Sequence, residues 1–324
     1  MMNRGIPRPN IVFFNSVINS LCKEGRVMDA HDVLDLVIGI GERPNVITFT
    51  SLIDGYCLVG KMDKAFKILH VMESVGVESD VVTYSALLDG YFKNRRIDDA
   101  LTFFREMPRK RIKPDTVTYH IMLDGLFHAR RTVAAMKMFH EMIESGTTVS
   151  IYTYSIILGG LCRNNCVDDA IALFQKLRSM NVKFNIEILN TMINATYKVQ
   201  RKEEAKDLFT TISANGLVPS ESTYAVMIRN LLKDGSVEDA DNMFSSMDNS
   251  GIVPGSRLLN DIIRMLLEKG EIAKAGNYLS KVDGKSISLE ASTTSMLSLF
   301  SRKGKHQEDI KLLPAKYQIF DGFS

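Results

Sequence analysis

The sequence repeats itself every 35 residues, and this period constrains the fold more than any other feature. Nine segments align without insertion or deletion, and they begin at Ile11, Val46, Val81, Thr116, Ile151, Ile186, Glu221, Ser256 and Ala291. Counting positions from the first residue of each segment, position 20 is alanine in eight of the nine. Self-similarity at a period of about 20–50 residues is typical of solenoids, in which each repeat is one supersecondary unit.

The residue pattern within each unit predicts two helices joined by a short polar turn. Position 4 is aromatic in six of nine units, and position 8 is Ile or Leu in eight, so apolar residues recur at helical spacing on one face. We predict a first helix over positions 2–13 and a second helix over positions 17–28. Glycine at position 31 and proline at position 34 recur in several units, and both end the second helix.

A pair of helices this short cannot bury its apolar face alone, so neighbouring units must stack. The expected fold is all-α, a right-handed superhelical solenoid of stacked 35-residue helix-turn-helix repeats. Residues 1–10 match the end of a further repeat, which predicts that the chain is a piece of a longer protein. Residues 11–290 are expected to form eight repeats, and residues 291–324 a degenerate ninth repeat with a C-terminal cap.

Composition excludes several classes of protein. The net charge is +2, so a strongly basic nucleic-acid binder is excluded, and any basic surface must come from the phase of the charges along the chain. Four cysteines are too few for a disulfide scaffold, and we interpret three of them, all at position 12, as core residues: Cys22, Cys57 and Cys162. The sequence shows no pattern of catalytic groups or metal ligands, and no apolar run of transmembrane length. We therefore expect no enzyme, no cofactor, no metal and no membrane partner.

The stretches ITFTSLIDGYC and VTYSALLDGYF, repeated at a constant period of 35 residues, resemble the pentatricopeptide repeat. The resemblance covers essentially residues 1–310, and it looks like the P class of the family and its restorer-of-fertility-like branch. The tetratricopeptide repeat has a period of about 34 residues and a signature that contains Trp, whereas this chain has no Trp. What the resemblance implies is binding of single-stranded RNA, with one unit for each base.

The family uses positions 5 and 35 of each unit to recognise the base edge. The resemblance therefore implies six recognition pairs, which are Asn15 with Asn45, Thr50 with Asp80, Ser85 with Asp115, His120 with Ser150, Ser155 with Asn185, and Asn190 with Ser220. In that order they resemble pairs for a pyrimidine, guanine, guanine, no assigned base, adenine and cytosine, so the expected core is Y-G-G-N-A-C. Two further pairs have no assignment, Ala225 with Gly255 and Asn260 with Glu290.

Two other positions are implied to contact RNA. Position 2 packs on base faces, and the side chains expected there are Val12, Ile47, Val82, Val117 and Tyr152. Position 13 contacts phosphates, and the cations expected there are Lys23, Lys93, Arg163, Lys198, Lys233 and Lys303. Because Glu187, Ser222 and Arg257 depart from the position-2 pattern, we expect residues 11–185 to carry most of the specificity. The C-terminal units are then mainly structural.

The resemblance also implies an organelle, the mitochondrion with the chloroplast as the alternative, although these residues contain no targeting peptide. The implied role is RNA processing, stability or translation, including fertility restoration in plants, with protein processing factors as further partners. The alternative function is a protein–protein interaction scaffold of the tetratricopeptide kind. In such a scaffold positions 5 and 35 would carry no restricted set of residues. Most of the first six units carry only Asn, Ser, Thr or Asp at both positions, which favours RNA.

Overall fold

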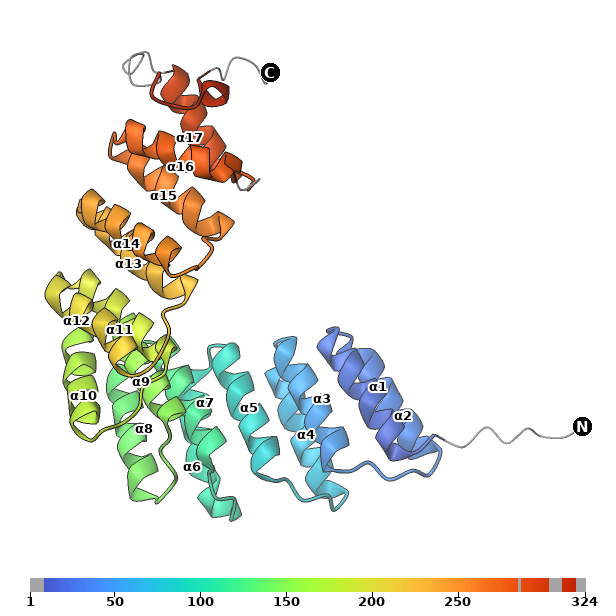
Figure 1. The fold of residues 1–324 in the computed structure, drawn as a ribbon. Coiled ribbons are helices and arrows are strands. Elements are labelled where there is room, and N and C mark those ends of the chain that lie inside the picture. Colours follow the sequence, from blue (N-terminus) through green and yellow to red (C-terminus); the bar gives the residue numbers. More distant parts are fainter. Residues whose placement is uncertain (1–8, 285–286, 303–310, 319–324) are drawn as a thin grey trace, which may run out of the picture. The chain divides into compact units, whose positions relative to one another are not determined.

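The computed structural model of the protein describes residues 9–284, 287–302 and 311–318. Within these ranges every regular element is a helix, and the helices form stacked hairpins (Figure 1). The predicted all-α fold is thereby confirmed. The chain divides into two compact units, Met1–Phe174 and Gln175–Ser324. The expected tail of a preceding repeat falls on residues 1–10, of which residues 1–8 lie outside the described ranges.

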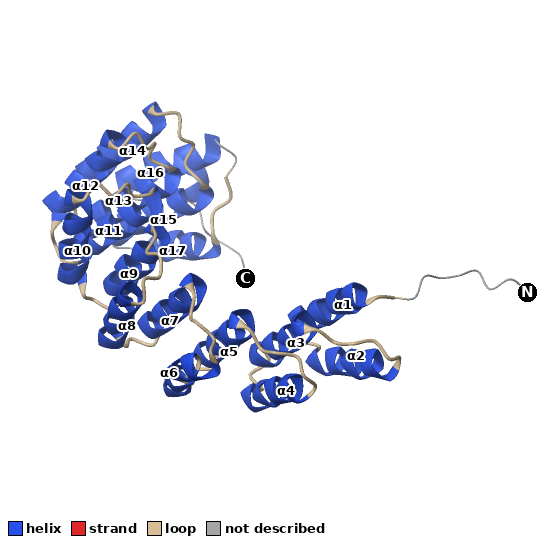
Figure 2. Ribbon diagram, turned by 90° about the horizontal axis from the view of Figure 1, so that it is seen from below, coloured by secondary structure: helices blue, strands red, loops and turns tan. Residues whose placement is uncertain are grey.

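The first compact unit is built from successive helical hairpins. Their first helices are α1 (Ile11–Lys23), α3 (Val46–Leu58), α5 (Val81–Lys93), α7 (Thr116–His128) and α9 (Ile151–Arg163). Their second helices are α2 (Val27–Gly39), α4 (Met62–Ser74), α6 (Ile97–Glu106), α8 (Thr132–Glu144) and α10 (Val167–Ser179), the last of which runs across the boundary at residue 174. Each first helix packs against the first helix of the next hairpin, so that α1, α3, α5 and α7 form one row and α2, α4, α6 and α8 a second (Figure 2).

The second compact unit repeats this arrangement. Its first helices are α11 (Ile186–Lys198), α13 (Glu221–Asp234), α15 (Ser256–Glu268) and α17 (Ala291–Arg302), and successive members again pack together. Its second helices are α12 (Lys202–Ala214), α14 (Val237–Asn249) and α16 (Ile272–Gly284). A short 3-10 helix, η2 (Ala315–Tyr317), follows near the C-terminus. There Tyr317 is buried, and its hydroxyl donates a hydrogen bond to Asp283 at 2.7 Å, so this segment packs on the end of α16.

The helix boundaries follow the repeat closely, with one exception in the third unit. First helices begin at position 1, one residue before the predicted start. Most second helices end at position 29, one residue after the predicted end. Helix α6 instead ends at Glu106 and is followed by the 3-10 helix η1 (Pro108–Lys110). Pro108 lacks the N–H that another helical turn would need. Arg111 then adopts a left-handed φ of 61° at position 31, where five other units have glycine.

The core is formed by the positions that the periodicity selects. Alanine at position 20 is buried in all eight units that carry it, which lets the two helices of a hairpin approach closely. The aromatic residues at position 4 are buried in five units, and Tyr154 is half-buried. Cys22, Cys57 and Cys162 are also buried, as predicted. Burial raises the pKa of the Cys57 thiol to about 12, as expected for a cysteine that serves as a packing residue.

Successive first helices meet at a specific small-residue contact. In the second to fifth units position 10 is glycine, and the residue at position 12 of the preceding unit lies directly against it. A Cβ added to Gly90 would lie 2.3 Å from Sγ of Cys57, and one added to Gly125 would lie 2.3 Å from Cγ of Phe92. The absence of a side chain at position 10 is therefore what allows neighbouring first helices to approach this closely.

None of the helices in the described ranges is long and apolar enough to cross a lipid bilayer.

The glycine contact predicts a difference between two adjacent substitutions in α9. Gly160→Ala should lower the free energy of unfolding by about 2 kcal/mol, because overpacking a filled contact has a cost of this order, and the new Cβ would lie 2.3 Å from Cγ of Phe127. Gly159→Ala is the matched control, since the nearest atom to its Cβ would be Nη1 of Arg163 at 3.5 Å. Alanine favours a helix interior by about 1 kcal/mol, so this variant should be neutral or stabilised. Urea unfolding followed by circular dichroism compares the two, and equal effects would contradict the proposed contact.

Candidate nucleic-acid interface

The residues at position 35 are the N-caps of the first helices. Asp80 caps α5, and its side chain accepts the backbone N–H of Thr83, three residues later. The same bond is made by the other predicted position-35 residues, Asn45, Asp115, Ser150, Asn185 and Ser220. Asn, Asp and Ser are the residues that N-caps prefer. The restricted set of residues at position 35 is thus accounted for by capping, and by itself it does not distinguish RNA binding from peptide binding.

In the first four pairs a threonine at position 3 joins the cap to the predicted partner at position 5. In the second unit the hydroxyls of Thr50 and Thr83 lie 2.8 Å apart, and the hydroxyl of Thr83 donates to Asp80 Oδ1 at 2.9 Å. Thr83 is fully buried. Two residues 30 apart in sequence are thereby held on one surface by a third side chain. Sequence reasoning missed the role of this threonine, although its recurrence before the position-4 aromatic residue is a visible signal.

The same linkage organises the neighbouring pairs. In the third unit Ser85 lies 3.0 Å from the Thr118 hydroxyl, which donates to Asp115 at 2.8 Å. In the first unit the amide of Asn15 also contacts its partner directly, since Nδ2 donates to Asn45 Oδ1 at 3.2 Å. The structure therefore brings together the first three predicted pairs.

The fourth pair keeps the threonine link, with a histidine at position 5, whereas the fifth and sixth pairs differ. His120 contacts Thr153, the residue that Ser150 caps, at 2.9 Å. Ser155 instead donates to the carbonyl of Ile151 in its own helix, and its predicted partner Asn185 belongs to the other compact unit. In the sixth pair Ser220 caps α13, whereas Oδ1 of Asn190 is buried and has no hydrogen-bond partner within the described residues.

The caps determine which polar atoms are offered outward. The Asp80 carboxylate can only accept, so the Thr83 proton goes to Asp80, and Thr50 must in turn donate its proton to Thr83. Thr50 Oγ1 and Asp80 Oδ2 therefore remain as acceptors. Asn45 uses Oδ1 for the cap, which leaves its Nδ2 as an outward donor. Units capped by Asp and by Asn consequently differ in hydrogen-bond polarity.

Beside these pairs runs a series of exposed apolar side chains at position 2. Their exposed fractions are similar, at 66% for Val12, 61% for Ile47, 59% for Val82, 58% for Val117 and 62% for Tyr152. Isolated exposed apolar residues are common, but the same exposure at the same position of five consecutive units is a regular apolar stripe. The stripe lies within the first compact unit.

The surface is hollowed next to the third, fourth and fifth units. A pocket of about 910 Å³ opens among α5, α7 and α9. Its lining includes the position-2 residues Val117 and Tyr152, together with His120 at position 5. Val117, His120 and Tyr152 therefore line a space large enough for a base, whereas Ser150, the partner of His120, is not part of its lining.

Acidic neighbours accompany the cations predicted to contact phosphates. Nζ of Lys93 lies 2.5 Å from Oδ2 of Asp89, and this hydrogen bond raises the pKa of Lys93. Nη2 of Arg163 lies 3.4 Å from Oδ1 of Asp124 in the preceding unit. Both aspartates stand at position 9, so this position offsets part of the basic stripe at position 13. The other predicted cations that the structure describes are exposed: Lys23, Lys198 and Lys233. Lys303 lies outside the described residues.

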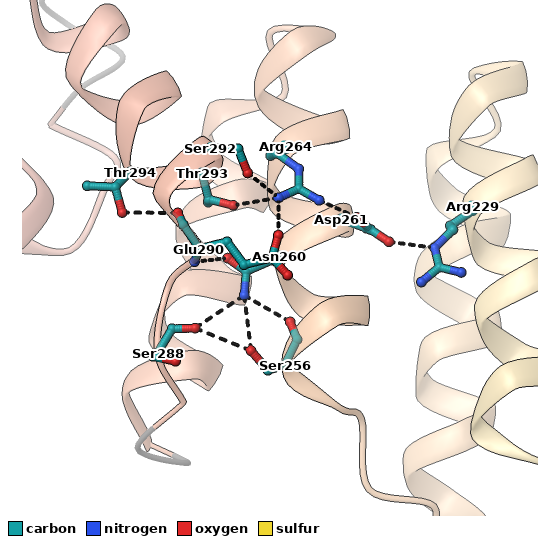
Figure 3. A network of polar contacts seen from close by, with 10 residues as sticks. All are labelled: Arg229, Ser256, Asn260, Asp261, Arg264, Ser288, Glu290, Ser292, Thr293 and Thr294. Carbon is teal, nitrogen blue, oxygen red and sulfur yellow. Dashed lines mark hydrogen bonds and ion pairs between the residues drawn. The ribbon is translucent and has the colours of Figure 1, made fainter. Parts of the chain in front are cut away.

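The pair in the eighth unit is engaged inside the protein (Figure 3). Asn260 is fully buried, and its Nδ2 donates to the carbonyl oxygens of Ser256 at 2.9 Å and Ser288 at 3.3 Å. Its Oδ1 accepts the backbone N–H of Glu290 at 2.9 Å. Both polar atoms of the Asn260 side chain therefore bond to the backbone, and the side chain is not accessible to solvent.

The Glu290 carboxylate belongs to a network of ion pairs (Figure 3). It accepts a hydrogen bond from Nη1 of Arg264 at 2.6 Å, and the same guanidinium contacts Asp261. Asp261 also accepts from Nε of Arg229 at 2.7 Å, which links α13 to α15. This network gives a physical basis for expecting the C-terminal units to be mainly structural. Among the described residues no cluster of three or more His, Cys, Asp or Glu could hold a metal ion.

Comparison with protein families identifies the chain. The model described as the PPR repeat matches residues 7–36, and that of the PPR repeat family matches residues 44–91, 79–128 and 122–163. The model of the pentacotripeptide-repeat region of PRORP matches residues 158–315. The protein is therefore a member of the pentatricopeptide repeat family. No curated protein shows significant sequence similarity to the chain.

Solved structures share the fold. The pentatricopeptide repeat protein PPR10 in complex with an 18-nt psaJ RNA element is similar with a TM-score of 0.52 and 21% identity, over 95% of this chain and 43% of that one. A cysteine-to-serine variant of PPR10 with the same RNA element gives the same values. PPR10 from maize gives a TM-score of 0.46 and 20% identity, over 94% of this chain and 53% of that one. The chain thus spans less than half the length of the PPR10 complexes, and at this identity the likeness shows the fold alone.

The capping bonds predict a matched pair of stability effects at Asp80. Asp80→Ala removes the acceptor for the Thr83 N–H and should lower the free energy of unfolding by about 1 kcal/mol. Asp80→Asn retains a good cap and should change it by no more than about 0.5 kcal/mol. Thermal unfolding at pH 7 measures both variants. If Asp80→Ala unfolded at the same temperature as the wild type, the cap would not stabilise α5.

Proposed function

We propose that the protein binds single-stranded RNA sequence-specifically, with one unit for each nucleotide, through the first helices of residues 11–185. The observation that carries the proposal is the register of the surface. Once in each of the first three units, an exposed apolar side chain stands beside a pair of short polar side chains linked through a buried threonine. Membership in the pentatricopeptide repeat family and a fold similar to that of PPR10, which was solved with RNA, support this proposal.

The hydrogen-bond polarity of the second and third units supports a preference for guanine. Thr50 and Asp80 keep acceptors that their internal hydrogen bonds do not use, and Ser85 with Asp115 makes the same hydrogen bonds, although Ser85 is buried. Guanine carries two adjacent donors on its Watson–Crick edge, N1–H and the N2 amino group. Adenine, cytosine and uracil each place at most one donor next to an acceptor there. Two neighbouring acceptors therefore match guanine better than any other base.

The first unit supports a different base for the same reason. Its cap is Asn45, which keeps an amino group that the cap does not use, whereas the buried Asn15 side chain bonds to Asn45 and Thr48. Amide donors complement the O2 and N3 acceptors of cytosine or the carbonyl oxygens of uracil. A pyrimidine at the first position of Y-G-G-N-A-C therefore agrees with the donor that Asn45 offers.

We extend the proposal to the role and location of the protein. By occupying its RNA, such a protein blocks a nuclease, remodels a hairpin or recruits a processing factor in an organelle, with the mitochondrion as our first choice and the chloroplast as the alternative. Fertility restoration belongs to this part of the proposal. Its support is the resemblance of the repeat sequences to the P class and the restorer-of-fertility-like branch.

Selection from a random RNA pool tests the central proposal. The 324-residue protein should enrich single-stranded molecules that contain Y-G-G-N-A-C, with the strongest constraint at the two guanines. High-throughput sequencing after several rounds measures the enrichment. Recovery of no motif, or of double-stranded RNA, would overturn the proposal. Binding of peptides in place of RNA would favour the interaction-scaffold alternative.

Asp80→Asn should change the base preference without changing the fold. The substitution converts the outward acceptor Oδ2 into an amino donor, while Thr50 Oγ1 remains an acceptor. A donor beside an acceptor matches N1 and N6 of adenine and also N3 and N4 of cytosine, so preference at the second nucleotide should move from guanine toward these two bases, by about tenfold in relative affinity for one base-edge pairing. Fluorescence anisotropy with RNAs varied at that nucleotide measures the change. An unchanged preference for guanine would contradict the assignment of this unit.

The ion pair between Lys93 and Asp89 predicts opposite effects of two substitutions. Lys93→Gln should weaken RNA binding and reduce the slope of log affinity against log salt by about 0.7, the value for one phosphate contact. Asp89→Asn should strengthen binding by about threefold, because it releases Lys93 from a competing carboxylate. Lys67→Gln on the second helix α4 makes the same change in net charge and serves as the control. Equal slopes for the two lysine variants would exclude Lys93 from phosphate contact.

A further inference from the structure

The fourth unit differs from its neighbours at two of the positions that surround a base. Position 2 of the following unit is Tyr152, whereas the equivalent residues before it are Val or Ile. Position 5 is His120, where the first three units have Asn, Thr and Ser. The recognition pair of this unit, His120 with Ser150, carries no base assignment from the family resemblance. Its base preference therefore has to be argued from the contacts.

The two rings are held in a defined arrangement. Nε2 of His120 lies 2.9 Å from the Thr153 hydroxyl, and Thr153 is fully buried and accepts the backbone N–H of Ser150 at 3.1 Å. The His120 and Tyr152 rings meet edge to face, with centroids 5.0 Å apart and an interplanar angle of 65°. Burial lowers the pKa of His120, so the imidazole is neutral at neutral pH and adds no charge to the surface.

The space beside the rings is open. Tyr152 remains 62% exposed although His120 touches it, and both residues line the pocket of about 910 Å³. Val117, 58% exposed, also lines this pocket and supplies an aliphatic contact. A base that enters here therefore meets an aromatic ring as well as an aliphatic side chain, whereas at the second and third units only aliphatic side chains stand at position 2.

We propose that the fourth unit is a purine-selective stacking site formed by Tyr152, His120 and Val117. The inference rests on the proposed function, because it requires RNA to bind along the first helices. Stacking strength grows with the area of the base, so an aromatic contact favours adenine and guanine over cytosine and uracil. Tyr152 supplies the stacking face, and His120, fixed through Thr153, positions that ring.

The test uses the full 324-residue protein and four RNAs that contain U-G-G-N-A-C with each base at the fourth nucleotide. The two purine RNAs should bind about fivefold tighter than the two pyrimidine RNAs, a preference of the size that stacking produces. Tyr152→Val places at this site the residue found in other units, and it should weaken the purine RNAs by about fivefold, to the level of the pyrimidine RNAs, and leave the pyrimidine RNAs nearly unchanged. Tyr152→Phe keeps the aromatic face and should behave as the wild type. Because Tyr152 is exposed, these variants are expected to fold, which circular dichroism verifies.

A fluorescent base reports the stacking directly. 2-Aminopurine at the fourth nucleotide should be quenched on binding to the wild type and to Tyr152→Phe, and less quenched on binding to Tyr152→Val. The same probe at the third nucleotide is the control, and its signal should not depend on residue 152. Failure of the wild type to bind any of the RNAs would overturn the proposed function. Selective binding at the second and third nucleotides with indifference at the fourth, or equal quenching by the valine variant, would overturn the stacking site alone.

Discussion

The contact between a glycine at position 10 and the side chain at position 12 of the preceding unit sets the spacing of the first helices. It recurs at Gly55, Gly90, Gly125 and Gly160, all in the first compact unit. The same packed helices bring position 5 of one unit within hydrogen-bond reach of the position-3 threonine of the next. In the sixth to eighth units position 10 is occupied by Ala195, Asn230 and Met265. There Oδ1 of Asn190 is buried without a hydrogen-bond partner among the described residues, and Asn260 bonds to backbone carbonyls. The close approach and the linked polar pairs therefore occur in the same part of the chain.

Helix capping and base selection use the same side chains. An N-cap must present an acceptor to the third residue of its helix, so Asn, Asp and Ser are all acceptable to the fold. They differ in what remains after the cap is made, since Asn45 retains an amino group and Asp80 a carboxylate oxygen. Exchange of one for the other leaves the local structure intact while it reverses the polarity offered to a ligand. A surface built in this way can change specificity at little cost in stability.

The period of 35 residues was sufficient to predict the fold class, the helices to within a few residues, and the core at positions 4, 12 and 20. The pairs that the first three units bring together were implied by the family resemblance and not by the period. The early end of α6 at Glu106, two residues before Pro108, does not follow from the period, because a repeat pattern carries no information on a single local exception. Three other features depend on side chains that meet across turns and between units. They are the direction of the hydrogen bonds at Thr83, the ion pair between Lys93 and Asp89, and the burial of Asn260. A periodic pattern specifies which positions are equivalent, but not which hydrogen bonds their different residues make.

The aspartates at position 9 bear on how a nearly neutral chain can bind a polyanion selectively. A phosphate that approaches Lys93 must replace Asp89, so one ion pair is exchanged for another and the net electrostatic gain is small. Nonspecific affinity for nucleic acid comes mainly from such phosphate contacts. When the phosphate contacts contribute little to affinity, an RNA stays bound only if its bases also form hydrogen bonds with the polar pairs and pack on the apolar stripe. The acidic residues thus lower affinity for every sequence equally, and the base contacts decide which RNA remains bound.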